Sequence, residues 1–153
     1  MKDAFLKTPE TDSVGDIPWQ DYPRPQLRRD SYLCLNGLWD FAVSREEFIP
    51  AYPQKIRVPF PPESPLSGVV GGHKKGEFLH YRRFFTLPEG FVQDRVLLHL
   101  GAVDQKAWVK VNGRLATIHE GGYLPIDLDI TEMLRSGENE LQVLAVDDLD
   151  KSY

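Results

Sequence analysis

Residues 107–119 read Ala-Trp-Val-Lys-Val-Asn-Gly-Arg-Leu-Ala-Thr-Ile-His, and this stretch decides the fold. Apolar side chains recur at every second position from Ala107 to Val111. That period places alternate residues of a β-strand against a core. The next two residues, Asn112 and Gly113, both tolerate the positive φ angles of a type I′ turn. The sequence therefore predicts a β-hairpin with a two-residue turn and a return strand over 115–119.

The same two-residue period recurs along the rest of the chain. Further strands are expected over 38–43, 56–60, 78–87, 95–100, 123–130 and 140–146, with one helical turn at 131–135. The turn signals fall about 8–12 residues apart, as in an antiparallel β-sandwich. The pattern contains no strand–helix–strand unit, which excludes a Rossmann-type cofactor domain. The predicted class is an all-β antiparallel sandwich, and periodicity alone leaves an immunoglobulin-like sandwich and a jelly roll open.

Composition sets the broad limits on function. The 153 residues are 41% hydrophobic and carry a net charge of −5, which suits one domain with a real core. The negative charge argues against a nucleic-acid partner, because phosphate binding needs a basic surface. No apolar run is long enough for a membrane span. The first residues lack the apolar segment of a signal peptide, so we expect a cytoplasmic protein, or a periplasmic or secreted one whose signal has been removed.

The chain offers few residues for cofactor or metal chemistry. Its four histidines (His73, His80, His99 and His119) lack metal-ligand spacing and are expected to be ordinary strand or loop residues. The single cysteine, Cys34, excludes an internal disulfide and is expected to be an inert buried thiol. The glycine-rich segment 68–76 lacks the Ser/Thr and helix of a phosphate-binding loop, so we expect a solvated loop. Neither a metal nor a cofactor is expected.

Charged residues favour two further interpretations. Arg82 and Arg83 fall on opposite faces of one expected strand, so one of them needs a carboxylate partner and a structural ion pair is expected. Acidic residues gather late in the chain, either as a solvated edge or as acceptors for sugar hydroxyls. They are Asp127, Asp129, Glu132, Glu138, Glu140, Asp147, Asp148 and Asp150.

Ten short motifs, taken in order, resemble one known family. They are Arg24-Pro25, Leu35-Asn36-Gly37-Leu38-Trp39-Asp40-Phe41, Val58-Pro59-Phe60, Glu63-Ser64-Pro65-Leu66-Ser67-Gly68-Val69, Tyr81-Arg82-Arg83-Phe84-Phe85, Gly101-Ala102-Val103-Asp104, Val111-Asn112-Gly113, His119-Glu120-Gly121-Gly122-Tyr123-Leu124-Pro125, Asp129-Ile130-Thr131 and Asn139-Glu140-Leu141. The series resembles the N-terminal sugar-binding domain of glycoside hydrolase family 2, whose members include β-galactosidases, β-glucuronidases and β-mannosidases.

The resemblance implies a galactose-binding-domain-like jelly roll over residues 21–150. Residues 1–20 would be an N-terminal arm or tail, and 151–153 the start of a linker. In the family an immunoglobulin-like domain and a TIM barrel follow, and the catalytic glutamates lie in the barrel. The chain is therefore expected to be a non-catalytic accessory domain of a retaining, β-galactosidase-like enzyme of carbohydrate metabolism, inactive by itself. The resemblance also leaves room for a homo-oligomeric parent enzyme.

The resemblance further implies which residues contact a β-linked glycoside, with weak binding by this domain alone. In some family members, two loops of the N-terminal domain reach the substrate pocket of the barrel. One carries an Asn-Pro pair, matched here by Ser64-Pro65 after Glu63. The other carries an Asp beyond the last strand, matched by Asp150 or by Asp147. Ser64 lacks the amide of the family's asparagine, and its roles as a ligand and as a plain turn residue both remain open.

Two other functions compete with the accessory domain. A free-standing carbohydrate-binding module would bind glycans through exposed aromatic side chains, for which Trp19, Tyr22, Trp108 and Tyr123 are the candidates. An exposed coplanar aromatic pair would favour that module. A purely structural domain without a ligand is the third possibility.

Overall fold

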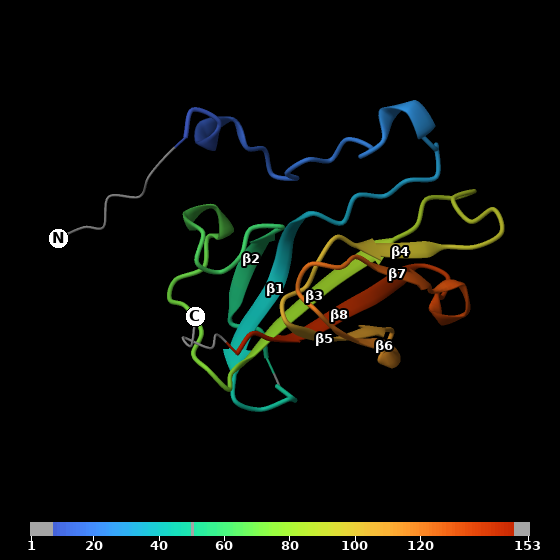
Figure 1. Cartoon of the computed structure of the whole chain (residues 1–153). Helices are drawn as coiled ribbons and strands as arrows, with labels where there is room; N and C mark the ends of the chain where they lie inside the picture. The colour runs from blue at the N-terminus through green and yellow to red at the C-terminus, as the bar shows by residue number, and fades with distance from the viewer. Residues whose placement is uncertain (1–7, 50, 149–153) are drawn as a thin grey trace.

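The computed structural model describes residues 8–49 and 51–148 of the chain (Figure 1). Its strands are β1 (Gly37–Ser44), β2 (Gln54–Val58), β3 (Phe78–Thr86), β4 (Leu97–Leu100), β5 (Lys106–Val111), β6 (Arg114–Glu120), β7 (Ile126–Asp129) and β8 (Glu138–Val146). Its 3-10 helices are η1 (Thr11–Ser13), η2 (Pro25–Leu27), η3 (Pro65–Ser67) and η4 (Thr131–Met133). No helix in this part of the chain is long and apolar enough to cross a membrane.

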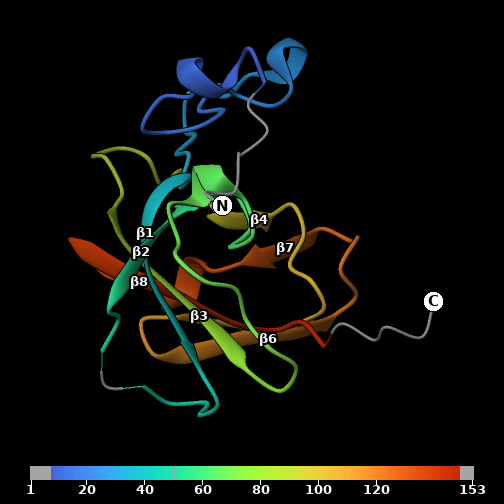
Figure 2. The same ribbon diagram turned by 90° about the vertical axis from the view of Figure 1, so that its left-hand side faces the viewer.

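The strands form two antiparallel sheets. The larger sheet has the order β2-β1-β3-β8-β5-β6, and the smaller one pairs β4 with β7. Every pairing is antiparallel, including the central β3–β8 pair that runs from Phe78↔Val146 to Thr86↔Glu138. Figure 2 shows β4 and β7 side by side and apart from the long strands of the larger sheet. The predicted all-β antiparallel sandwich is confirmed.

The core lies between the two sheets and follows the predicted alternation. On β8, Leu141, Val143 and Ala145 are buried while the residues between them are partly exposed. They pack in one cluster with Phe41 of the large sheet and Leu98 of the small one. Each large apolar side chain buried in this way contributes about 1.5–3 kcal/mol to the free energy of folding.

The predicted hairpin turn is confirmed at Asn112-Gly113. Their φ angles are 52° and 77°, so both residues occupy the left-handed region that the turn requires. The Asn112 side chain also ties the hairpin to its neighbours. Its Nδ2 donates to the Met133 carbonyl and to Asn139 Oδ1, both at 2.8 Å, and its Oδ1 accepts from the Glu140 N–H at 2.9 Å. Asparagine here therefore serves both the turn and the packing of η4 on β8.

Three expected elements have other bounds than their patterns suggested: one strand is shifted to Gln54–Val58, and the other two elements are shorter. The strand expected over 56–60 ends at Val58, because Pro59 has no N–H to donate to a ladder. The alternation over 123–130 becomes a strand only at Ile126, since Pro125 also lacks a donor. The helical turn expected over 131–135 ends at Met133. Beyond it, the buried Asn139 side chain bonds both the N–H and the carbonyl of Arg135 and holds the backbone out of a helix.

The segment before β1 lies along one end of the sandwich, drawn in blue in Figure 1. The Trp19 ring packs on Phe60 with a centroid distance of 5.4 Å, and Asn36 Nδ2 donates to the Pro18 carbonyl at 2.9 Å. Cys34 is a free thiol that is only partly buried. The described part of this segment, from residue 8 onward, is thus fastened to the strands by specific contacts.

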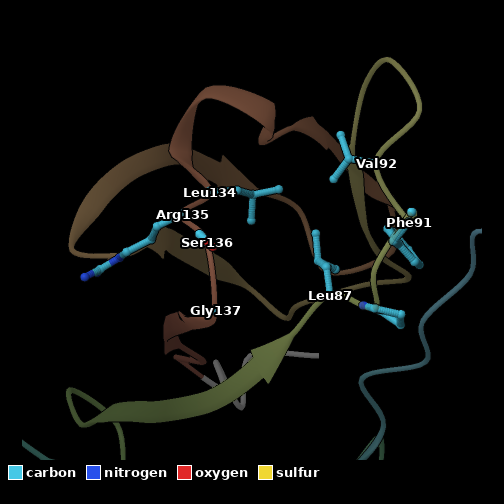
Figure 3. A pocket seen from close by; sticks show the side chains of 9 residues that line it. Leu87, Phe91, Val92, Leu134, Arg135, Ser136 and Gly137 are labelled. Carbon is cyan, nitrogen blue, oxygen red and sulfur yellow. The ribbon is translucent and has the colours of Figure 1, made fainter.

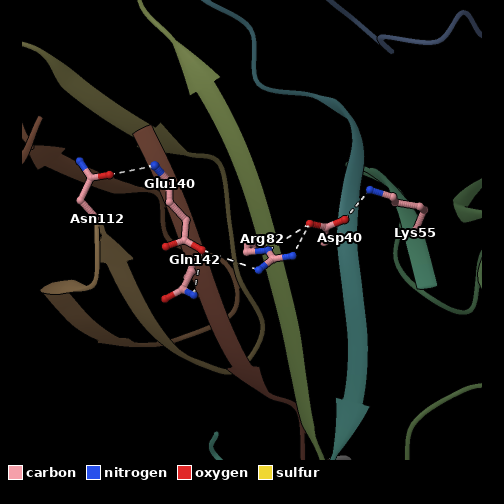
Figure 4. Close-up of polar contacts among 6 residues, drawn as sticks. All are labelled: Asp40, Lys55, Arg82, Asn112, Glu140 and Gln142. Carbon is pink, nitrogen blue, oxygen red and sulfur yellow. Dashed lines mark hydrogen bonds and ion pairs between the residues drawn. The ribbon is translucent and has the colours of Figure 1, made fainter. Parts of the chain in front are cut away.

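Arg82 forms the expected ion pair, on the outer face of the large sheet (Figure 4). Its Nε and Nη2 donate to Asp40 Oδ2 at 3.0 and 2.9 Å, and Lys55 bonds the other carboxylate oxygen. The Tyr52 ring covers the guanidinium at 4.1 Å. Burial alone would raise the pKa of Asp40, but the hydrogen bonds from Lys55 and Arg82 outweigh it and lower that pKa.

Candidate functional site

The structure brings two of the four candidate residues together at one end of the sheet. Glu63 and Ser64 lie in the loop between β2 and η3, and Asp147 directly follows β8. Asp150 lies outside the described residues. A fifth residue, His73, joins the two segments: its Nδ1 is 3.1 Å from Glu63 Oε1, and its Nε2 is 3.2 Å from the Asp147 carbonyl oxygen. We call Glu63, His73 and Asp147 the rim.

His73 lies in the glycine-rich loop that the sequence predicted to be solvated. That prediction is wrong for this side chain, which is only 5% exposed. The loop is also fixed at its end, because the Gly76 N–H donates to Asp148 Oδ1 at 2.8 Å. No local pattern indicates these contacts, since His73 is 10 residues from Glu63 and 74 from Asp147.

Ser64 uses its hydroxyl within its own turn. Its Oγ accepts from the Leu66 N–H at 3.3 Å and caps the first turn of η3. The Ser64 N–H donates to the Pro61 carbonyl at 2.9 Å. The sequence left open whether Ser64 is a sugar ligand or a plain turn residue, and this geometry supports the turn residue.

The rim is acidic, and the buried Tyr81 side chain lies near its carboxylates. Burial raises the pKa of Asp147, and the carboxylates of Asp104, Glu63 and Asp148 raise it further, while His73 acts in the opposite direction. The Tyr81 hydroxyl lies close enough to feel the same charges. Burial, followed by Glu63 and Asp147, raises its pKa far above the usual value, so this hydroxyl stays protonated.

A further loop is packed against the rim. The Gln105 N–H donates to the Val146 carbonyl at 2.9 Å, and the Gly121 N–H donates to the Gln105 carbonyl at 2.8 Å. This chain of bonds places the loop over 121–125 beside the end of β8. The Tyr123 side chain in that loop is 94% exposed. Carboxylates, a buried imidazole and an open aromatic ring are groups that can accept hydroxyl hydrogen bonds and contact a sugar ring.

The exposed aromatic residues do not form a stacking platform. Trp19 contacts Phe60 at an interplanar angle of 49°, and Tyr22 contacts Tyr32 edge-on at 69°. Trp108 is half-buried beneath Lys106. Within residues 8–49 and 51–148, no coplanar aromatic pair is present. The feature that would favour a free-standing carbohydrate-binding module is therefore missing from the part that the structure describes.

A hollow lies at the opposite end of β3 and β8 from the rim. It has a volume of about 330 Å³ and is lined mainly by apolar side chains of the β3–β4 connection and of the segment before β8 (Figure 3). Leu87, Phe91, Val92 and Leu134 surround it, and Arg135 lies at its edge. The described residues hold no group of three or more side chains suited to a metal ion.

The fold defines an antiparallel β-sandwich domain of the all-β class. The model for "Glycosyl hydrolases family 2, sugar binding domain" matches residues 51–153, and the chain belongs to this family. The relationship that the sequence motifs suggested is thus confirmed.

The similar proteins are mostly β-glucuronidases. The enzyme of Felis catus is 33% identical over 135 residues, which cover 76% of this chain and 20% of the enzyme. The enzyme of Paenibacillus borealis is 27% identical over 132 residues, which cover 80% of this chain and 22% of the enzyme. A β-galactosidase of Thermoanaerobacter pseudethanolicus is 38% identical over 60 residues, which cover 39% of this chain and 8% of that enzyme. The chain therefore spans about a fifth of the glucuronidases that it matches.

Solved structures give the same result. The β-glucuronidase of Ruminococcus gnavus in complex with D-glucuronic acid matches with a TM-score of 0.63 and 27% identity, over 76% of this chain and 22% of that one. The β-glucuronidase of Bifidobacterium dentium, complexed with coumarin-3-O-glucuronide, matches with a TM-score of 0.57 and 26% identity. The match covers 73% of this chain and 19% of that one. The β-galactosidase-like specificity expected from the sequence is not confirmed by these matches.

Proposed function

We propose that this chain is the non-catalytic sugar-binding domain of a retaining β-glycosidase that acts on β-glucuronides. The match of residues 51–153 to the family carries the proposal, and the glucuronidases among the similar proteins supply the substrate class. The remaining domains of the parent, an immunoglobulin-like domain and a TIM barrel, would hold the catalytic glutamates.

In this arrangement the rim forms part of the wall of the substrate pocket. Glu63 and Asp147 come from separate loops and meet at one end of the sheet, where they accept hydrogen bonds from sugar hydroxyls. A hydrogen bond to a charged group contributes about 1.5–3 kcal/mol when water is excluded, and much less in open solvent. The rim alone is open, so the isolated chain is expected to bind sugars only at millimolar concentration.

Domain replacement tests the proposal. The first domain of the Ruminococcus gnavus β-glucuronidase would be exchanged for this chain, and hydrolysis of aryl β-glucuronide, β-galactoside and β-mannoside compared. We expect turnover of the glucuronide by the hybrid and none by the isolated chain. A soluble hybrid with no turnover, or one that prefers the galactoside, would contradict the proposal.

A further inference from the structure

The hydrogen bonds of the His73 ring require more protons than a neutral imidazole carries. Nδ1 faces the Glu63 carboxylate at 3.1 Å, and Nε2 faces the Asp147 carbonyl at 3.2 Å and the Asp147 carboxylate at 3.6 Å. A backbone carbonyl only accepts, and so does an ionised carboxylate. A neutral imidazole offers one donor, whereas the imidazolium offers two. The geometry therefore fits the cation.

The ionisable side chains that contact His73 directly are carboxylates. Glu63 and Asp147 contact the ring directly, and Asp104 and Asp148 act on Asp147. Tyr81 on β3 is neutral. The cations nearest in the sequence, Lys74 and Lys75, have exposed side chains in the same loop. The ring itself is shielded from water, so these charges are screened less than they would be on the surface.

We propose that His73 is the positioning residue of the rim: its imidazolium holds the Glu63 loop against the end of β8, and loss of the proton releases one of the two contacts. The separation of the two carboxylates then changes with pH across the range in which histidines titrate. We call His73 with its contacts to Glu63 and Asp147 the clasp. The clasp is a property of this chain, whereas its importance for a substrate rests on the proposed function.

A protonated clasp is suited to an anionic sugar. The rim holds the carboxylates of Glu63 and Asp147, and those of Asp104 and Asp148 act on Asp147. The sugar of a β-glucuronide also carries a carboxylate. Like charges at short range repel, and the imidazolium between Glu63 and Asp147 reduces that repulsion. We therefore infer that the pH dependence of the rim matters more for uronic acids than for neutral sugars.

NMR of the 153-residue chain tests the clasp without any sugar. Long-range ¹H–¹⁵N spectra of the histidine rings would be recorded from pH 5 to 8, together with the backbone amides of Ser64 and Asp148. At the acidic end we expect protons on both ring nitrogens of His73, and we expect the two amides to shift with the same midpoint as the ring. The variant H73Q should abolish those amide shifts. The control H99Q should preserve them, because His99 pairs with Asp127 on the other sheet.

A second variant keeps the test independent of how well H73Q folds. In E63Q the ring faces a neutral amide instead of the Glu63 carboxylate, so the Ser64 amide should no longer shift together with the ring. A His73 ring that remains one neutral tautomer from pH 5 to 8 would overturn the inference. So would amide shifts that persist unchanged in a folded H73Q. Both outcomes concern the free chain, so they are distinguishable from a failure of the domain replacement.

Discussion

The Asp104 side chain occupies the space where a β-carbon would stand at Gly122. A β-carbon at that position would lie 2.0 Å from Asp104 Oδ1, 2.4 Å from its Cγ and 3.0 Å from its Cβ. The loop over 121–125 can approach the rim because position 122 has no side chain.

We expect G122A to destabilise the fold by about 1–3 kcal/mol, the usual cost of inserting a methyl group into filled space. Urea unfolding of the wild type, G122A, D104A and the double variant would measure it. The cost of G122A should be smaller in the D104A background, because D104A removes the two closest atoms. Equal costs in both backgrounds would show that the contact with Asp104 is not the cause.

The hairpin turn gives a prediction with a matched control. Gly113 and Gly101 both have open space around them, but only Gly113 has a positive φ, of 77°. G113A should therefore cost about 1–2 kcal/mol from left-handed backbone strain, and G101A should cost less. Thermal unfolding of the two variants measures the difference. Equal stability would mean that the turn in solution differs from type I′.

Local patterns predicted most of the strands but not their arrangement. Alternation around Val109 and Leu141 marks strands because each buries one face, and Asn112-Gly113 marks the turn through its φ preference. Periodicity does not encode which strands pair, so the jelly roll came from the family resemblance. The contacts of His73 depend on segments that are distant in sequence, and no short motif reports them.

The pair of Asp40 and Arg82 should make stability depend on pH. Since the pKa of Asp40 is lowered on folding, the pair adds stability above the unfolded pKa, and that stability is lost as the pH falls through the folded value. D40N should cost about 1–3 kcal/mol at pH 7 and progressively less below about pH 4. The exposed pair of Asp127 and His99 supplies the control D127N, which should cost below about 1 kcal/mol. A cost of D40N that does not change with pH would rule out the ionised pair.

Asp147 should have the opposite pH dependence. Its pKa is raised by burial and then by Asp104, so its contribution favours the folded state at low pH and is lost as the pH rises through the folded pKa. D104N removes the neighbouring negative charge that acts most strongly on Asp147, and it should therefore lower the pKa of Asp147. Carboxyl ¹³C titration of the two proteins measures that pKa. An Asp147 titration unaffected by D104N would show that the charge of Asp104 does not act on it.

We propose that the rim acts on substrate, and the kcat/KM of the domain-replaced enzyme with an aryl β-glucuronide tests this action. We expect D147N and E63Q each to lower kcat/KM about tenfold, the effect of losing roughly 1.4 kcal/mol of binding in the transition state. The control D127N, on the other sheet, should leave kcat/KM unchanged. Values for D147N and E63Q equal to that of the unmodified hybrid would show that the rim does not act on substrate.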